Sequence, residues 1–351
     1  MKTKLPDIGK ISPEVFDELI LPHLGAKRNS VAVPPQNGVD VGIITIGNQA
    51  MAMTTDPVFI VPEYGFDRAA WFAIHILASD VVTSGLPPTY LSIDLNLPMS
   101  ITEEQLELMW RTIHTECEKL EIAIVCGHTA RYDNCHYPMV GGATLMAVGP
   151  QDAYVSPGFA RAGDHIIITK GPGIEAAGIF AAMFPGRIEK EFGKSFAQEA
   201  ESIFYQMSVV KDALTAVSIG VRDEGISAMH DATECGIWGG VYELAQAAGL
   251  GVRLNKEVIV RNDAAVRICK HFKISDPFAA ISEGTLILSC RPHKSKAVID
   301  ALTMEGIPAS VAGELLPADQ GMKVIEKGTE KEFRHPRVDP FWKAFYQTLN
   351  G

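Results

Sequence analysis

Six acidic residues are the best candidates for chemistry in this sequence, because they stand at strand ends or on apolar helix faces: Asp40, Asp56, Asp80, Asp231, Glu234 and Glu283. Asp80 is the most informative of them, since Ile76 and Leu77 just before it belong to the apolar stripe of a predicted helix. A carboxylate on such a stripe needs a metal ion, a basic side chain or backbone donors, because burying an unpaired charge is costly. One such aspartate alone favours a loop cap, whereas several together favour a ligand role.

Clustered carboxylates suit Mg²⁺, a hard cation that takes oxygen ligands and commonly bridges to substrate phosphates, which implies a nucleotide. The two commonest phosphate-binding loops, G-x-x-x-x-G-K-[ST] and a G-x-G-x-x-G after a strand, are absent. Gly171-Pro172-Gly173 stands between a predicted strand and helix, where its amides could meet an anion or simply form a turn.

Two other groupings are weaker. His128, Cys135 and His136 include zinc-type ligands, but their spacing fits no structural zinc pattern. His230 and Asp231 could work as an acid and base pair, but adjacent residues on a strand point to opposite faces, so we expect no direct cooperation between them.

The elements that must position these residues are short in the first half of the chain. A hairpin over 41–46 and 51–55 turns at Gly47-Asn48 and ends at Asp56-Pro57. A helix capped by Asp67 carries Asp80 and stops near Gly85, and a half-buried strand over 90–97 follows. We expect a helix after Ser100-x-x-Glu103, a buried strand over 122–125 that leads into a loop at 126–129, and a strand over 139–148.

A loop-like stretch at 149–164 precedes a second series of elements. We predict strands near 165–169, 226–229 and 285–289, helices near 175–183, 196–219, 238–248 and 263–271, and a last αβ unit. The order of elements predicts an α+β fold with helices layered on sheets.

Composition narrows the class of protein. The chain has 351 residues, enough for about two domains, with 47% hydrophobic and 21% charged residues, as in folded soluble proteins. The net charge of −11 disfavours nucleic-acid binding and attraction to anionic lipid. We find no membrane-spanning stretch or signal sequence and expect a cytoplasmic protein.

The six cysteines are too sparse for a disulfide scaffold, and we expect reduced thiols. Cys117, Cys126 and Cys290 fall on or beside apolar elements and are predicted to be packed. Cys135 lies in a polar stretch and is predicted to react first with alkylating reagents.

Taken in order, several segments resemble the superfamily related to aminoimidazole ribonucleotide synthetase, and especially its hydrogenase-maturation branch with the archaeal relatives. The matching segments are Gly38-Val39-Asp40, Thr54-Thr55-Asp56, Ser79-Asp80 with Gly85-x-Pro87, Gly127-His128-Thr129, Gly163-Asp164, His230-Asp231-Ala232-Thr233-Glu234 and Ser282-Glu283-Gly284. Each segment is weak alone, but their order and spacing over roughly 38–315 are specific.

The resemblance implies a two-domain α/β (α+β) protein. Residues 1–150 would form an N-terminal domain that binds ATP and pairs with its twin in a shared β-barrel, and residues 155–351 a ferredoxin-like α+β domain. It also implies a homodimer that binds ATP with Mg²⁺ near the dimer interface, phosphorylates or activates a small-molecule substrate, and has another maturation protein as a partner. Apolar strands at 41–46 and 51–55 agree with a dimer, because they would leave an exposed sheet edge in a monomer.

By the same resemblance, Asp40, Asp56 and Asp80, together with His128 and Thr129, correspond to positions that handle ATP and Mg²⁺. Thr233, Glu234 and Glu283 would line the substrate cleft, and Asp231 would lie there as well and ligate a metal with the first three aspartates. The catalytic residues are not assigned.

Three departures from the family pattern matter. His128 stands where several members have an aspartate, and Cys235 stands where a glycine is usual. The carrier cysteine near the C-terminus of the hydrogenase-maturation enzymes is missing, since this chain ends Thr348-Leu349-Asn350-Gly351. The departures at His128 and Cys235 leave open a non-catalytic nucleotide-binding scaffold. A metal-dependent phosphate-ester hydrolase built on the same carboxylates is the second alternative.

Overall fold

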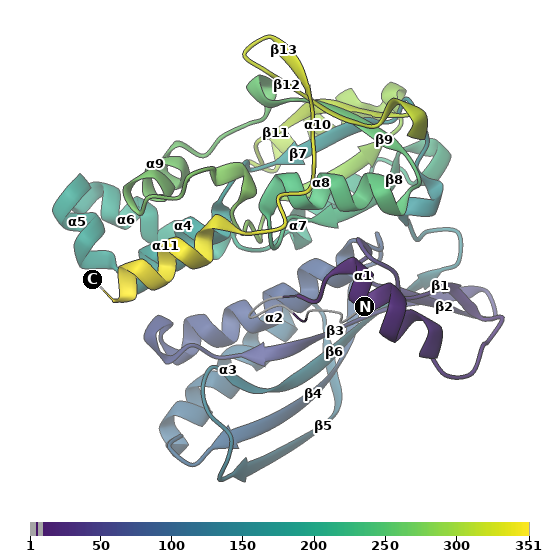
Figure 1. The fold of residues 1–351 in the computed structure, drawn as a ribbon. Coiled ribbons are helices and arrows are strands. Elements are labelled where there is room, and N and C mark those ends of the chain that lie inside the picture. Colours follow the sequence, from purple (N-terminus) through teal and green to yellow (C-terminus); the bar gives the residue numbers. More distant parts are fainter. Residues whose placement is uncertain (1–4, 6–9, 351) are drawn as a thin grey trace.

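The computed structural model describes residue 5 and residues 10–350, and it shows two layered units stacked one on the other (Figure 1). Each unit is built on one mixed β-sheet with helices packed against it, six strands in the first sheet and seven in the second. The predicted mixed α/β fold with two domains is therefore confirmed.

The first sheet has the strand order β1-β2-β3-β6-β4-β5. Only β4 and β5 run parallel, and the other neighbours are antiparallel. Its strands are β1 (Val31–Val33), β2 (Gly42–Ile46), β3 (Gln49–Phe59), β4 (Pro88–Pro98), β5 (Ala123–Tyr132) and β6 (Met139–Pro150).

Alternation along these strands gives the sheet one covered and one open face. In β4 the apolar Leu91, Ile93 and Leu95 are buried, while the residues between them, such as Ser92 and Asp94, are half-buried on the opposite face. The helices α2 (Phe66–Val82) and α3 (Glu103–Lys119) cover the apolar face (Figure 1).

Helix α2 lies at the centre of the molecule. It packs on β3 and β6 of the first sheet and also contacts α7 and β8 of the second unit. Eleven of its seventeen residues are buried, including the polar His75 and Ser79. Ser79 Oγ accepts a hydrogen bond from the backbone of Val209 at 3.1 Å, and His75 Nδ1 lies 2.9 Å from Ser208 Oγ. The helix therefore belongs to the cores of both units.

The second sheet has the order β13-β12-β9-β11-β7-β10-β8. Its strands are β7 (His165–Thr169), β8 (Ile226–Asp231), β9 (Gly251–Asn255), β10 (Leu286–Cys290), β11 (Ala309–Leu316), β12 (Met322–Glu326) and β13 (Thr329–Glu332). The antiparallel core β11-β7-β10-β8 places the strands in the order fourth, first, third, second, as in ferredoxin-like domains.

Helices cover both faces of this sheet, which explains the unbroken apolar run in β7. Ile166 and Ile168 pack with α8 (Gly236–Ala247), while Ile167 faces the core shared with α2, α7 (Val210–Val217) and α10 (Pro292–Met304). The remaining α-helices of the described residues are α1 (Pro13–Val15), α4 (Ile174–Met183), α5 (Pro185–Phe192), α6 (Lys194–Ile203), α9 (Asp263–His271) and α11 (Pro340–Leu349).

Two strand predictions were wrong at their ends. β3 continues past Asp56-Pro57 to Phe59, because it keeps pairing with β6 up to Met139. Residues 126–129 form no loop but the middle of β5, where Cys126 pairs with Ser92 and His128 with Asp94 of β4. β5 is an edge strand exposed along most of its length, with Val125 53% exposed, so its polar sequence looked like a loop.

The predicted helix caps were also displaced. Gly65, not Asp67, is the N-cap of α2. Thr102 and Gln105 form the capping box of α3, in place of the predicted Ser100 and Glu103. The hairpin β12–β13 and the final helix α11 were not predicted.

Among the helices of the described residues, none has the length and apolar character required to cross a membrane.

Candidate functional site

Three buried or half-buried carboxylates from different elements meet where the two units touch. Asp40 lies in the loop before β2, Asp80 in the last turn of α2, and Asp231 is the last residue of β8. Oxygen and nitrogen atoms of Asp40, His230 and Asp231 lie within 4.8 Å of one another, a spacing suited to a metal ion. The site is thus built from both sheets.

Asp231 is the least satisfied of these groups. Its side chain is 0% exposed, and neither carboxylate oxygen has a hydrogen-bond partner among the described residues. Burial, followed by the negative charge of Asp40, raises the pKa of Asp231 to about 6. A bound cation would supply the missing interactions.

Asp80 faces the same place from α2. Its Oδ2 accepts a hydrogen bond from Thr54 Oγ1 at 2.8 Å, which fixes the carboxylate against β3. Burial and the nearby carboxylates of Asp231, Asp56 and Asp40 raise the pKa of Asp80 well above its usual value. Asp56, two residues beyond Thr54 on β3, adjoins Asp80.

His230 joins the two units. Its Nδ1 lies 2.7 Å from Asp40 Oδ2, and its Nε2 lies 3.0 Å from Glu243 Oε2 on α8. Burial alone would lower the pKa of His230, but these two carboxylates raise it well above its usual value. With a carboxylate at each nitrogen, the ring is held as an imidazolium between the domains.

The expectation that the side chains of His230 and Asp231 point to opposite faces was wrong. His230 Nδ1 lies 3.9 Å from Asp231 Oδ1, and both side chains approach Asp40. The alternation rule does not hold here because Asp231 ends β8 and the chain turns at once, with the Thr233 amide donating to the Asp231 carbonyl.

Gly38 lets the Asp40 loop lie directly on α8. Its φ is +74°, and a Cβ at this position would come 2.6 Å from the Glu243 carbonyl oxygen. No other residue type fits so close to that backbone without a shift. Gly38 thus explains how a loop of the first unit reaches His230 of the second.

A second pair of carboxyls adjoins Asp231. Glu283, in the loop before β10, is 1% exposed, and its Oε2 has no hydrogen-bond partner among the described residues. Glu175, in the first turn of α4, accepts a hydrogen bond from the Glu283 amide at 3.0 Å through its Oε2. Burial raises the pKa of Glu175 to about 8, and burial with the charges of Asp231 and Glu175 raises that of Glu283.

The turn between β8 and α8 meets the N-terminal segment. Lys10 donates from Nζ to Thr233 Oγ1 and from its backbone to Glu234 Oε2, each at 3.4 Å. Loss of solvent would lower the pKa of Lys10, but the carboxylates of Glu243, Asp80 and Asp40 raise it. Lys10 therefore brings a positive charge to the edge of the acidic cluster.

Cys235 closes this turn in a left-handed conformation, with φ +63°. Its amide donates to Asp339 Oδ2 at 2.8 Å, and Asp339 also caps α11. Burial raises the pKa of the Cys235 thiol to about 12. The sequence interpretation that a side chain crowds this turn agrees with the geometry, because glycine is the residue that adopts positive φ freely.

His128 and Thr129 do not join the cluster within one chain. Both are exposed on β5, and His128 Nε2 lies 3.0 Å from Tyr132 Oη of the same strand. His128 lines a shallow cavity of about 440 Å³ on the open face of the first sheet. The other residues around that cavity are Thr55, Ser92, Ile93, Asp94, Cys126, Gly127, Gly142, Ala143 and Thr144.

The prediction that Cys126 is packed was wrong. The side chain is exposed on β5, and its Sγ lies 3.1 Å from Ser92 Oγ. Cys117 and Cys290 are buried as expected, and Cys135 is half-buried.

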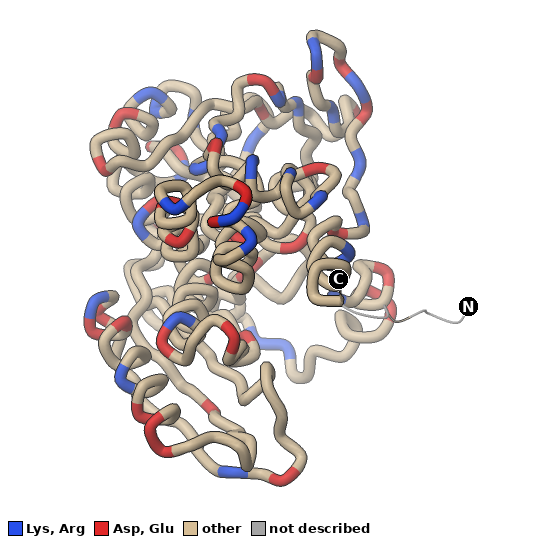
Figure 2. The backbone as a smooth tube through the Cα atoms, turned by 90° about the vertical axis from the view of Figure 1, so that its left-hand side faces the viewer, with Lys and Arg blue, Asp and Glu red and all other residues tan. Residues whose placement is uncertain are grey.

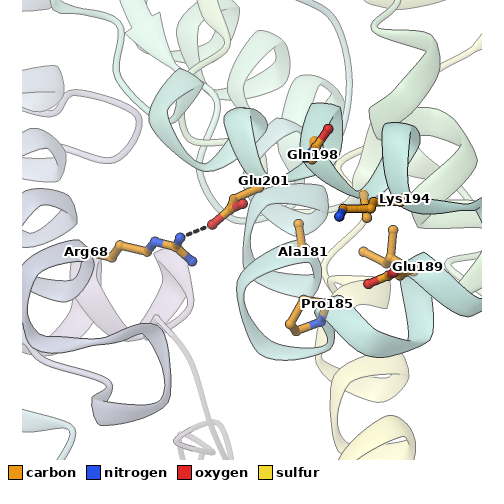
Figure 3. A pocket seen from close by; sticks show the side chains of 9 residues that line it. Arg68, Ala181, Pro185, Glu189, Lys194, Gln198 and Glu201 are labelled. Atoms are coloured by element: carbon orange, nitrogen blue, oxygen red, sulfur yellow. Dashed lines mark hydrogen bonds and ion pairs between the residues drawn. The ribbon is translucent and has the colours of Figure 1, made fainter.

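A smaller cavity of about 200 Å³ lies elsewhere between the units (Figure 3). Arg68 of α2 reaches across to Glu201 of α6 in an ion pair, while Lys194 and Glu189 stand farther along the rim (Figure 3).

Ion pairs also link the two strands of the hairpin at the edge of the second sheet. The β12–β13 hairpin at the top of Figure 2 carries the pairs Lys323–Glu330 and Lys331–Glu326.

Sequence reasoning missed Glu175, Glu243, Lys10 and Asp339. Glu243 and Glu175 lie on helices where a glutamate is ordinary, so the sequence carried no signal for them apart from the Gly171-Pro172-Gly173 turn before Glu175. Their roles depend on which helix end meets which loop.

Comparison with known proteins identifies the family. The N-terminal domain model of the AIR synthase related proteins matches residues 38–148, and the C-terminal domain model matches residues 161–325. The chain belongs to the AIR synthase related family.

Two curated relatives show how the chain compares along its length. It is 22% identical over 300 residues to a putative hydrogenase expression/formation protein of Methanocaldococcus jannaschii, covering 84% of each chain. It is 24% identical over 314 residues to the carbamoyl dehydratase HypE of Escherichia coli, covering 87% of this chain and 88% of that protein.

Solved structures support the fold. A HypE–HypF complex matches with a TM-score of 0.72 and 17% identity, over 92% of this chain and 99% of that one. The hydrogenase maturation protein HypE in complex with ATP matches with a TM-score of 0.65 and 20% identity, over 94% and 97%. At such identities the likeness establishes the fold alone.

Proposed function

We propose that this protein binds ATP together with Mg²⁺ between its two sheets and uses it to phosphorylate or otherwise activate a small molecule. The observation that carries the proposal is Asp231, whose two carboxylate oxygens are buried without hydrogen-bond partners close to Asp40 and Asp80. The ATP complex of a HypE with the same fold supports it.

The donor set fits Mg²⁺. Ligand atoms of Asp40 and Asp231 lie within 4.8 Å of each other, and the Asp80 carboxylate is near enough to interact with the charges of both. Hard oxygen ligands of this kind are what this cation prefers. Both nitrogens of His230 already meet carboxylates, which leaves the oxygens as ligands. Asp56 would join them through its contact with Asp80. When bound, Mg²⁺ would neutralise charge on the phosphates and on the transferred group.

Residues of the chain itself would then orient the reactants. His230 would hold Asp40 in place through its ring, and Thr54 would do the same for Asp80. Lys10 and Thr233 stand at the open edge of the cluster, where they would meet phosphate oxygens. Glu234 and Glu283 would line the substrate side.

Calorimetric titration with ATP, with and without Mg²⁺, tests the binding step, and ADP release in the presence of cell extract metabolites tests turnover. ATP affinity that depends on Mg²⁺ is expected. No binding in either condition would contradict the proposal. Binding without turnover under any condition would favour the scaffold function. The departures from the family pattern at His128 and Cys235 support that alternative.

A metal-dependent phosphate-ester hydrolase uses the same carboxylates without a nucleotide. Cleavage of p-nitrophenyl phosphate with Mg²⁺ alone, abolished in Asp231→Asn, would favour that function over the ATP-dependent one.

We also propose a homodimer formed through the open face of the first sheet. Within the chain this face is uncovered, as Figure 1 shows for the side of β3, β6 and β4 opposite α2. Exposed apolar residues on the sheet, such as Ile46, Tyr90 and Val125, support it. Sedimentation at low micromolar concentration should give about twice the 38.0 kDa chain mass; a monomer would contradict it.

The division into residues 1–150 for ATP binding and dimerisation and 155–351 for the α+β domain belongs to the same proposal. So does a partner among maturation proteins, which the HypE–HypF complex of a similar fold supports. Co-purification of the tagged full-length chain with HypF from a hydrogenase-producing host tests that partner.

A further inference from the structure

We propose that Glu175 and Glu283 form a subsite that binds a protonated nitrogen group of the substrate, such as an amidinium or ammonium group. The inference rests on the proposed function, since it places this group beside the site where ATP and Mg²⁺ would react. It names a substrate class that the ATP site alone does not specify.

The geometry of the pair is that of an incomplete binding site. Glu175 Oε2 is held by the Glu283 amide at 3.0 Å, and Glu283 Oε1 is held by the Gly284 amide at 3.0 Å. Glu283 Oε2 is buried and has no partner among the described residues. Backbone amides therefore orient both carboxyls and leave Glu283 Oε2 free to accept a further hydrogen bond. Glu175 is only half-buried, so a ligand can reach it from solvent.

The charges around the pair are all of one sign. The side chains whose charges act on Glu175 are all acidic, Asp339, Glu234 and Asp231, and those that act on Glu283 are Asp231 and Glu175. No Lys or Arg of the described residues forms an ion pair with either carboxyl. A buried carboxylate without a partner is costly, so a ligand that donates N–H bonds and brings positive charge would be bound strongly.

A second metal ion is the rival occupant. The described residues contain one group of three or more ligand side chains that is close enough for a metal, and it consists of Asp40, His230 and Asp231. Glu175 and Glu283 are outside that group. An organic cation can lie along two carboxyls without a third ligand, and the Mg²⁺ affinity of Glu175→Gln, measured below, separates it from a metal ion.

Thermal unfolding of the full-length chain with acetamidinium chloride tests the subsite, with acetamide and sodium chloride as matched neutral and ionic controls. We expect acetamidinium to raise the midpoint in a saturable way, while acetamide and sodium chloride do not. Glu175→Gln should weaken the affinity for acetamidinium at least about tenfold. Glu191→Gln, on the exposed surface of α5, should leave it unchanged.

Equal effects of acetamidinium and acetamide, or equal affinity in Glu175→Gln and the parent chain, would overturn the proposal. Glu283→Gln gives an independent second variant, and circular dichroism shows which variants are folded. A tenfold loss of Mg²⁺ affinity in Glu175→Gln would also overturn it, because the pair would then be a metal site.

The two proposals fail separately. Binding of acetamidinium by a chain that does not bind ATP with Mg²⁺ would overturn the proposed function and support the subsite. Binding of ATP with Mg²⁺ by a chain that does not bind acetamidinium would overturn the subsite alone.

Discussion

The acidic cluster between the sheets and the polar cavity on the open face of the first sheet both carry residues that the sequence singled out, yet their physical states differ. Asp231 and Glu283 are buried with oxygens that lack hydrogen-bond partners, and half-buried Asp80 faces like charges. Cys126 and His128 are exposed, and each lies beside a neighbour that satisfies it. A pattern of residue types predicts that a position matters, but only burial without a partner indicates that a ligand is expected there.

The largest effect should be the difference in alkylation rate between an exposed thiol of the first sheet and a buried thiol of the second unit. Cys126 lies open on β5, whereas burial raises the pKa of Cys269 to about 12 and blocks access to it. We expect iodoacetamide at pH 8 to label Cys126 at least about a hundredfold faster than Cys269, as measured by peptide mass spectrometry. Half-buried Cys135 should fall between them. If Cys126 resists labelling in the native protein and reacts after dilution, a partner chain covers the sheet face.

Substitutions at the two regions should separate their roles in binding. Asp80→Asn and Asp231→Asn should each weaken the affinity for ATP with Mg²⁺ by one to two orders of magnitude, about 1.4–2.8 kcal/mol, in calorimetric titration. His128→Asn, on the exposed strand, should change it by less than about threefold. A loss at His128 as large as at the aspartates would mean that the two regions form one site, which a dimer would have to assemble.

Gly38→Ala tests whether the close backbone contact beside the acidic cluster stabilises the fold. The new Cβ would meet the Glu243 carbonyl, so we expect a loss of about 2–4 kcal/mol in the free energy of unfolding. Gly47→Ala is the matched control, because Gly47 also has a positive φ of +61° but open space around it. Its loss should stay near about 1 kcal/mol. Equal losses in denaturant titrations would show that the close contact between loop and α8 is not important.

In metal-free protein, the free energy of unfolding should depend on pH through the buried carboxyls of the acidic cluster. The pKa of Glu175 is raised from 4.5 to about 8 and that of Asp231 from 3.8 to about 6, so the folded chain holds more protons than the unfolded chain between these values. Stability should therefore be greatest below about pH 4 for these groups and fall as pH rises toward 8. Glu175→Gln should flatten the upper part of the decline in melting temperature, while Glu191→Gln should not.

Much of the fold could be predicted because its signals are local. The alternation in β4, the apolar run of β7 and the stripe of α2 that places Asp80 inward all follow from side-chain periodicity. The motif order also identified Asp40, Asp80 and Asp231, which the structure brings together.

The rest depends on contacts between distant segments. Residues 126–129 of β5 looked like a loop because an exposed edge strand needs no apolar alternation, and only their pairing with β4 shows that the strand continues there. Glu243 and Glu175 were missed because their meaning comes from the facing elements, Gly38 against α8 and Glu283 against α4.

Helix α2 has a further consequence for how the chain folds. Its buried side chains divide between the first sheet and the helices of the second unit, with His75 and Ser79 hydrogen-bonded to the segment before α7. A fragment ending near residue 150 would leave Phe72, His75 and Ser79 facing water, without the surface they pack against. We therefore expect the two sheets to unfold as one cooperative unit, so that a fragment divided at the topological boundary between them would not fold by itself.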